Sequence, residues 1–229
     1  MFLNKLDRPG ASFKASLSSL LSHRLHPHPL ALVLPVASFD PRHYEQAEPG
    51  IEGLVDLVKW EVWKWGQDGT MTRHPLPRDS TDLDDLDFIP SPHPLLAHLL
   101  PARTQLLENL AMFSEELMDQ LLNLASTPAS YLHIDSSSII PHLRRATLNG
   151  QVLPVLCGSA MKDIGTNLVM DYVGELLAGP TDVSYDSQAK NPPVRLLAWK
   201  VSWDKKRGWM TFVRVYSGAF EIIFLGSRY

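Results

Sequence analysis

Two short polar segments of the chain carry side chains suited to reading a nucleobase. Asn4, Lys5 and Asp7 form the pattern N-K-x-D near the start, and Ser159 and Ala160 follow a short apolar run far downstream. The Asp7 carboxylate can accept paired hydrogen bonds from guanine N1–H and its exocyclic amine, a donor pair that adenine lacks. Asn4 would hold the loop and approach the far edge of the base, the stem of Lys5 would cover one ring face, and a backbone N–H near Ala160 would donate to guanine O6. With Ser159, these residues form the predicted guanine-base site.

The segment from Phe2 to Gly10 resembles the corresponding loop of translational GTPases of the elongation factor G family. Further matches occur in the order that the family has. They are Gly53 to Val58, Glu115 to Met118, Leu143 to Thr147 and Phe212 to Gly218. The resemblance covers roughly residues 1 to 218 and implies GTP and GDP as ligands, with Mg²⁺ bound by the full-length parent.

The phosphate-binding half of such a site has no counterpart in the sequence. A P-loop, G-x-x-x-x-G-K-[ST], would bind the phosphates. No segment of the 229-residue sequence matches this motif. Asp7 to Gly10 reads D-x-P-G, as in a second switch, but it overlaps the guanine motif and lacks the His that the family places next. We therefore expect a fragment, truncated at both ends, that does not hydrolyse GTP by itself although its parent does. A short product that lost catalysis is the alternative.

Asp204 to Gly208 resembles the mitochondrial ribosome-releasing branch of the family more than the translocating branch. The resemblance implies a GTP-dependent translation factor of the mitochondrial matrix that acts on the mitochondrial ribosome with ribosome recycling factor, disassembling ribosomes after termination. Translocation during elongation is the alternative within the family. A truncated, non-catalytic binding module, which contacts a partner through the insert or the residual guanine pocket, is the alternative from another class.

The composition excludes several other classes of function. A formal net charge of −4 gives no overall basic footprint of a dedicated nucleic-acid binder, so we expect no sequence-specific nucleic-acid partner. No apolar run reaches the roughly 18 residues that cross a bilayer, so no membrane partner is expected. Cys157 is the single cysteine and is expected to be a buried strand residue. Closed zinc sites favour thiolate ligands, and the chain has only one cysteine, so we expect no metal site despite its nine histidines.

The spacing of apolar residues predicts the elements that must position the two polar segments. The predicted helices cover residues 13–25, 106–124 with Ser114 as a cap, 138–147 and 168–177. The predicted strands cover residues 30–36, 50–65 as a hairpin, 152–156, 195–201 and 210–216. Residues 73–101 are rich in Pro and Asp and predict a solvated, disordered loop.

These elements and the family resemblance predict an α/β fold. It would comprise the C-terminal part of a P-loop-type GTPase domain with an inserted α+β subdomain, followed by the start of a β-barrel domain. The expected divisions are 1–39 and 143–180 for the GTPase domain, 40–142 for the insert with its Pro-rich loop near 73–101, 181–193 for a linker and 194–229 for the incomplete barrel.

Overall fold

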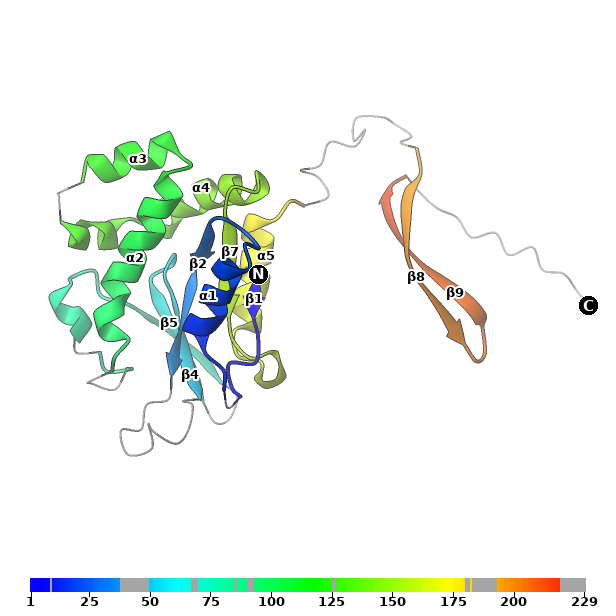
Figure 1. The fold of residues 1–229 in the computed structure, drawn as a ribbon, viewed down its shortest axis with the longest axis horizontal. Helices are drawn as coiled ribbons and strands as arrows, with labels where there is room; N and C mark the ends of the chain where they lie inside the picture. The colour runs from blue at the N-terminus through cyan, green and yellow to red at the C-terminus, as the bar shows by residue number, and fades with distance from the viewer. Residues whose placement is uncertain are drawn as a thin grey trace, which may run out of the picture. The chain divides into compact units, whose positions relative to one another are not determined.

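The computed structural model describes residues 1–8, 10–37, 50–66, 70–84, 86–89, 93–124, 127–179, 182 and 193–218. The chain divides into two units, Met1–Leu177 and Ala178–Tyr229. The first unit is mixed α/β and contains a parallel and an antiparallel sheet (Figure 1). The predicted α/β class is therefore confirmed at this level.

The parallel sheet brings the two polar segments to one edge. Its strands are β1 (Phe2–Leu3), β7 (Leu153–Cys157) and β2 (Pro29–Ala31), in the order β1-β7-β2. The middle strand β7 is apolar and largely buried, as expected of a parallel strand covered on both faces. The strand predicted over 152–156 and the burial predicted for Cys157 are confirmed. Because β1 and β7 run in the same direction, the loops that follow them leave the sheet at the same edge.

Strand β2 of the parallel sheet continues along the chain into the antiparallel sheet. After Leu32 the chain enters β3 (Val33–Ala37), which pairs with β4 (Ile51–Asp56), and the order is completed by β5 (Glu61–Trp65) and β6 (Met71–Pro75). The Leu32 N–H donates to the Val155 carbonyl, and the Leu32 carbonyl accepts from the Leu57 N–H, both at 2.9 Å. The extended run 29–37 thus connects both sheets, and the predicted strand 30–36 and the predicted hairpin 50–65 are confirmed.

The described residues of the first unit form five α-helices, which lie around the strands of that unit (Figure 1). They are α1 (Phe13–Ser22), α2 (Leu96–Ala111), α3 (Glu115–Leu122), α4 (Ser136–Leu148) and α5 (Thr166–Leu176). The single helical stripe predicted over 106–124 is two helices, because Ser114 has an extended backbone and caps α3 by accepting from the Leu117 N–H at 3.4 Å. The predicted cap is confirmed. None of the helices in the described ranges has the length and apolar character needed to cross a bilayer.

The prediction of a loop over residues 73–101 is wrong where the structure forms regular elements. The end of β6, a short 3-10 helix η1 (Thr81–Asp84) and the start of α2 all fall within it. Among the described strands, β6 pairs with β5 alone and lies at the sheet edge, so it needs no continuous apolar face. Pro101 lies inside α2, where an interior proline costs about 3 kcal/mol. Burial of several leucines of α2, at about 1.5–3 kcal/mol each, outweighs that cost.

The second unit contains a two-stranded antiparallel hairpin, β8 (Arg195–Asp204) and β9 (Gly208–Ser217). The Asp204 carboxylate accepts from the backbone N–H groups of Lys206 and Arg207 at 2.8 and 2.9 Å, and Gly208 has a φ of 75°. These features close the turn, and the strands predicted over 195–201 and 210–216 are confirmed. Most of the expected linker and residues 219–229 of the expected barrel lie outside the described residues.

Candidate guanine-base site

Backbone hydrogen bonds connect the loop after β1 to the loop after β7. The Gly158 N–H donates to the Leu3 carbonyl at 3.1 Å, and the Leu6 N–H donates to the Gly158 carbonyl at 3.2 Å. Leu6 is buried, which anchors the first loop against the sheet. The two loops therefore remain hydrogen-bonded to each other beyond the ends of β1 and β7, and the two polar segments face each other.

Asn4 forms the side-chain bridge between these loops. Its Oδ1 accepts from the Ala160 N–H at 2.9 Å and from the Lys5 N–H at 2.8 Å. Lys5 is exposed and has a φ of 67°, a left-handed conformation that allows this tight turn. The Ala160 N–H is therefore already bonded to Asn4, and a base that takes a hydrogen bond from it must share it or displace Asn4.

The Asp7 carboxylate lies mostly covered at the same place, with 13% of its side chain exposed. The Ser159 hydroxyl is the largest cause that lowers the Asp7 pKa, and the charges of Lys162 and Arg8 act in the same direction. Ser159 Oγ is buried, and it forms no hydrogen bond of normal distance and angle to any group in the described part of the chain. Asp7 is consequently ionised at neutral pH and can act as an acceptor for two donors.

Two glycines allow the second loop its compact path. A Cβ on Gly158 would lie 2.2 Å from the Ile164 carbonyl oxygen. Gly165 has a φ of 82°, and its Cβ would lie 2.7 Å from Leu54 Cδ1 and 2.9 Å from the Cys157 oxygen. Because Gly165 has no side chain, the loop can lie close to Leu54 of β4. The sequence identified Gly158 as part of the motif, but it indicated no role for Gly165.

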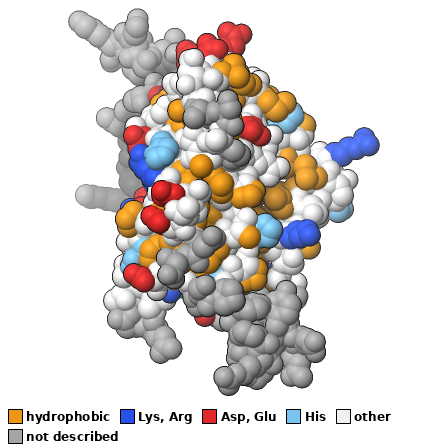
Figure 2. Space-filling view, turned by 90° about the vertical axis from the view of Figure 1, so that its left-hand side faces the viewer, with side chains coloured by type: hydrophobic (Ala, Val, Ile, Leu, Met, Phe, Trp, Pro, Cys, Tyr) orange, Lys and Arg blue, Asp and Glu red, His pale blue; other side chains and the backbone are white. Residues whose placement is uncertain are grey.

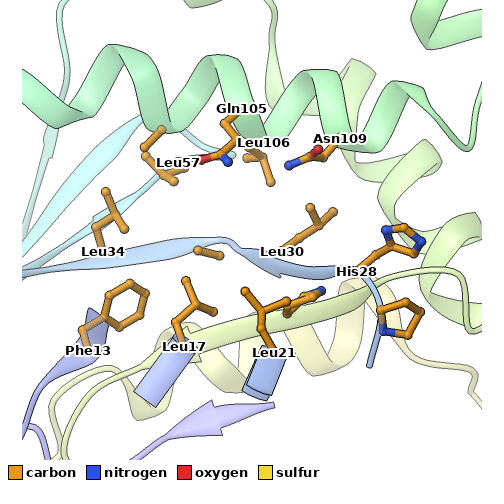
Figure 3. A pocket seen from close by; sticks show the side chains of 14 residues that line it. Phe13, Leu17, Leu21, His28, Leu30, Leu34, Leu57, Gln105, Leu106 and Asn109 are labelled. Atoms are coloured by element: carbon orange, nitrogen blue, oxygen red, sulfur yellow. The ribbon is translucent and has the colours of Figure 1, made fainter. Parts of the chain in front are cut away.

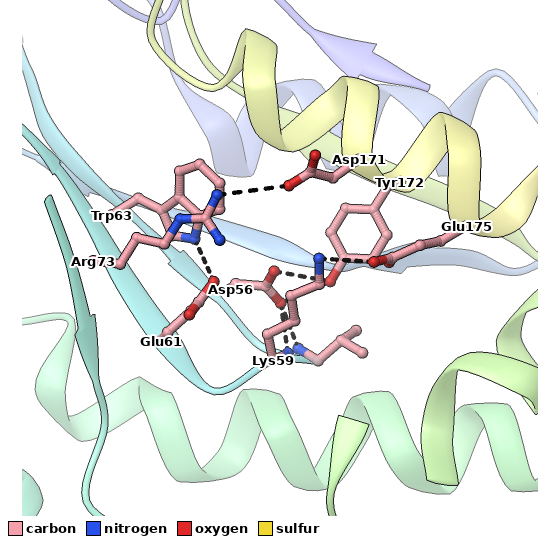
Figure 4. A network of polar contacts seen from close by, with 9 residues as sticks. Asp56, Lys59, Glu61, Trp63, Arg73, Asp171, Tyr172 and Glu175 are labelled. Atoms are coloured by element: carbon pink, nitrogen blue, oxygen red, sulfur yellow. Dashed lines mark hydrogen bonds and ion pairs between the residues drawn. The ribbon is translucent and has the colours of Figure 1, made fainter. Parts of the chain in front are cut away.

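A buried carboxylate, Asp56, connects the end of β4 to α5, the helix that follows the second loop (Figure 4). Its Oδ1 accepts from the backbone N–H groups of Val58 and Lys59 at 2.8 Å, and the Tyr172 hydroxyl contacts its two oxygens at 2.7 and 2.9 Å. Burial raises the Asp56 pKa to about 6, although these hydrogen bonds oppose the shift. Sequence reasoning missed this contact, because nothing in the sequence brings Asp56 and Tyr172 together.

Charged side chains extend the same network along α5 (Figure 4). Lys59 Nζ lies 2.9 Å from Glu175 Oε1, and Arg73 on β6 lies 3.8 Å from Asp171. The Arg73 guanidinium also lies over the Trp63 ring, 3.9 Å from its centre. Polar contacts thus hold α5, the helix that follows the second loop, to β4, to the turn after β4 and to β6.

Arg103 on α2 binds the opposite side of the turn that follows β4. Its guanidinium donates to the carbonyls of Leu57, Val58 and Ile134, the last two at 2.9 and 2.6 Å. Burial lowers the Arg103 pKa to about 10, which leaves the side chain charged. The turn is therefore fixed between α2 and α5.

A separate apolar cavity of about 330 Å³ lies between α1, β2 and α2 (Figure 3). Leu17 and Leu21 line it from α1 and Leu30 from β2, while Gln105 and Asn109 face it from α2. None of the predicted base-binding residues lines this cavity.

Hydrophobic side chains also gather across the middle of the face in Figure 2, among scattered charges. Within the described ranges, no three His, Cys, Asp or Glu side chains come together as a metal site.

No protein-family model matches the chain. It is 27% identical over 237 residues to the mitochondrial ribosome-releasing factor 2 of Vanderwaltozyma polyspora, an alignment that covers 96% of this chain and 28% of that protein. The chain thus spans less than a third of the length of this relative. A crystal structure of a protein from Thermus thermophilus has the same fold, with a TM-score of 0.63, 21% identity and coverage of 95% of this chain and 27% of that one. The chain is therefore similar along nearly its whole length to mitochondrial ribosome-releasing factor 2, and the predicted resemblance to the elongation factor G family is confirmed.

Proposed function

We propose that the loops after β1 and β7 form the guanine-binding part of a GTP site. The observation that carries this proposal is the hydrogen bond from the Ala160 N–H to Asn4 Oδ1. It joins residues from the two segments that the sequence alone predicts to read one base. The ionised Asp7 carboxylate beside it supplies the acceptor that a guanine edge requires.

The described residues suit a guanine base rather than a whole nucleotide. Asp7 would accept from N1–H and the exocyclic amine, the stem of Lys5 would cover a ring face, and the Ala160 N–H would donate to O6. Charge-assisted contacts to phosphates supply much of the affinity of nucleotide sites, and this sequence contains no P-loop. We therefore propose base recognition without GTP hydrolysis by this chain, whereas the full-length parent would bind Mg²⁺ and hydrolyse GTP.

For the whole protein we propose GTP-dependent disassembly of mitochondrial ribosomes after termination, in the matrix and together with ribosome recycling factor. The support is the name of the relative and the resemblance of residues 204–208. Residues 40–142 would be the subdomain inserted into the GTPase domain, and residues 194–229 would begin the β-barrel domain. Mitochondrial translocation is the second candidate, and the two are distinguished by whether the full-length protein splits post-termination ribosomes or advances elongating ones.

Replacing Asn4 with Ala tests the base site through the bond that defines it. We expect Asn4→Ala to weaken guanosine binding about fivefold, because loss of one hydrogen bond costs about 1 kcal/mol and releases the second loop. Equilibrium titration with guanosine measures the change. Asn123→Ala, at an exposed position after α3, is the matched control and should bind like the wild type. Equal affinity of Asn4→Ala and the control would contradict the proposal.

A further inference from the structure

Lys162 lies close to the Asp7 carboxylate, which is proposed to read the base. Its Nζ is 4.0 Å from Asp7 Oδ2, and its own side chain is 59% exposed. It ends the short 3-10 helix η3 (Ala160–Lys162), which begins at the residue bonded to Asn4. The sequence motifs assign no role to this lysine.

The backbone around Lys162 is fixed relative to the second loop. The Lys162 N–H donates to the Ser159 carbonyl at 3.2 Å, and Ser159 and Ile164 exchange backbone hydrogen bonds at 2.9 and 3.0 Å. Asp163 then turns the chain with a φ of 57°. The same closed turn contains Ser159, Ala160 and Lys162, and it places the Lys162 ammonium group near Asp7.

Asp7 is surrounded by groups of both loops. From the second loop it faces the buried Ser159 hydroxyl and the Lys162 ammonium, and from its own loop it faces the Arg8 charge. Arg8 belongs to the loop that carries Asp7, so it cannot hold that loop against the other one. Lys162 supplies the charge that acts across the two loops.

Resting on the proposed function, we infer that Lys162 is a positioning residue for guanine recognition: its ammonium holds the Asp7 carboxylate against the second loop, ionised and directed at the base edge. The pair is partly exposed, so the attraction is modest and sensitive to salt. Its effect is on the ionisation and orientation of Asp7 rather than on direct contact with the base.

The test compares Lys162→Met and Lys162→Arg with the wild-type chain, and uses Lys14→Met on α1 as a control for loss of one exposed charge. An NMR pH titration of the Asp7 carboxyl carbon reports its pKa, and guanosine titration at several pH values reports affinity. Lys162→Met should raise the Asp7 pKa and weaken guanosine binding about two- to fivefold, with the larger loss at low pH. Lys162→Arg should restore both properties, and Lys14→Met should change neither.

An unchanged Asp7 pKa in Lys162→Met overturns the inference, and so does a loss of affinity that Lys162→Arg fails to restore. If the wild-type chain does not bind guanosine, the proposed function fails and the role of Lys162 in recognition fails with it. If guanosine binds equally to wild type and Lys162→Met, the proposed function stands and the inference alone is overturned.

Discussion

Replacing Asp7 with Asn is expected to lower guanosine affinity about 10- to 100-fold, the loss typical of a hydrogen bond to a charged group, and to make xanthosine the better ligand. Guanine presents two donors, N1–H and the exocyclic amine, to the Asp7 carboxylate. An Asn amide offers one acceptor and one donor, so its NH₂ would oppose the amine of guanine. The O2 carbonyl of xanthine would instead accept from that NH₂.

Titration of the Asp7→Asn chain with guanosine, xanthosine and adenosine measures this exchange. Asp119→Asn, at an exposed position of α3, removes the same charge elsewhere and should keep the preference for guanosine. A uniform loss for all three nucleosides, with no gain for xanthosine, would mean that Asp7 supports the loop and does not read the base.

The second large effect is a gain of stability on mild acidification that depends on Asp56. Its pKa is about 6 in the folded chain, compared with 3.8 for an unperturbed carboxyl in the unfolded chain. The folded state therefore binds this proton more tightly, so stability rises as pH falls through the folded pKa and is lost again as pH rises through it. Between pH 7 and about pH 4.5 the gain is about 2 kcal/mol, since one pKa unit corresponds to about 1.36 kcal/mol.

Denaturant unfolding at a series of pH values checks this, with Asp56→Asn as the variant that cannot titrate. The difference between the two proteins is the useful quantity, because Asp7 and Glu116 have lowered pKa values and contribute in the opposite direction at lower pH. The wild type should gain about 2 kcal/mol relative to Asp56→Asn on acidification. Parallel pH profiles would show that Asp56 is charged to a similar extent in the folded and unfolded chains.

The sequence predicted the elements whose apolar pattern is strong and local. The strand before Ser159 and the helix over 138–147 are apolar runs or stripes bounded by polar residues, and both are found close to the expected positions. The pairing of the two base loops was inferred from motif chemistry, and the structure brings Asn4 and Ala160 together. The roles of the five predicted residues towards guanine stay predictions.

Two of the three missed features depend on contacts between segments that are distant in the sequence. Asp56 is one of three carboxylates in the hairpin over 50–65, and only the fold reveals that Tyr172 donates to it. Strand β6 is polar because it lies at a sheet edge, so its pattern resembles that of a loop. Pro101 falls within the Pro-rich loop expected over 73–101, but it lies inside α2, where tertiary burial outweighs its cost. For Asp56 and Pro101 the deciding energy comes from partners far away in the sequence, whereas β6 pairs with the preceding strand β5.

The most direct test of the guanine-base site is an NMR titration of the isotope-labelled wild-type chain with guanosine and adenosine. The site predicts that guanosine shifts the backbone signals of residues 4–7 and 158–162, including the Ala160 N–H that is bonded to Asn4, whereas adenosine at equal concentration leaves them in place. Equal shifts with both nucleosides, or guanosine shifts confined to other parts of the chain, would contradict the account.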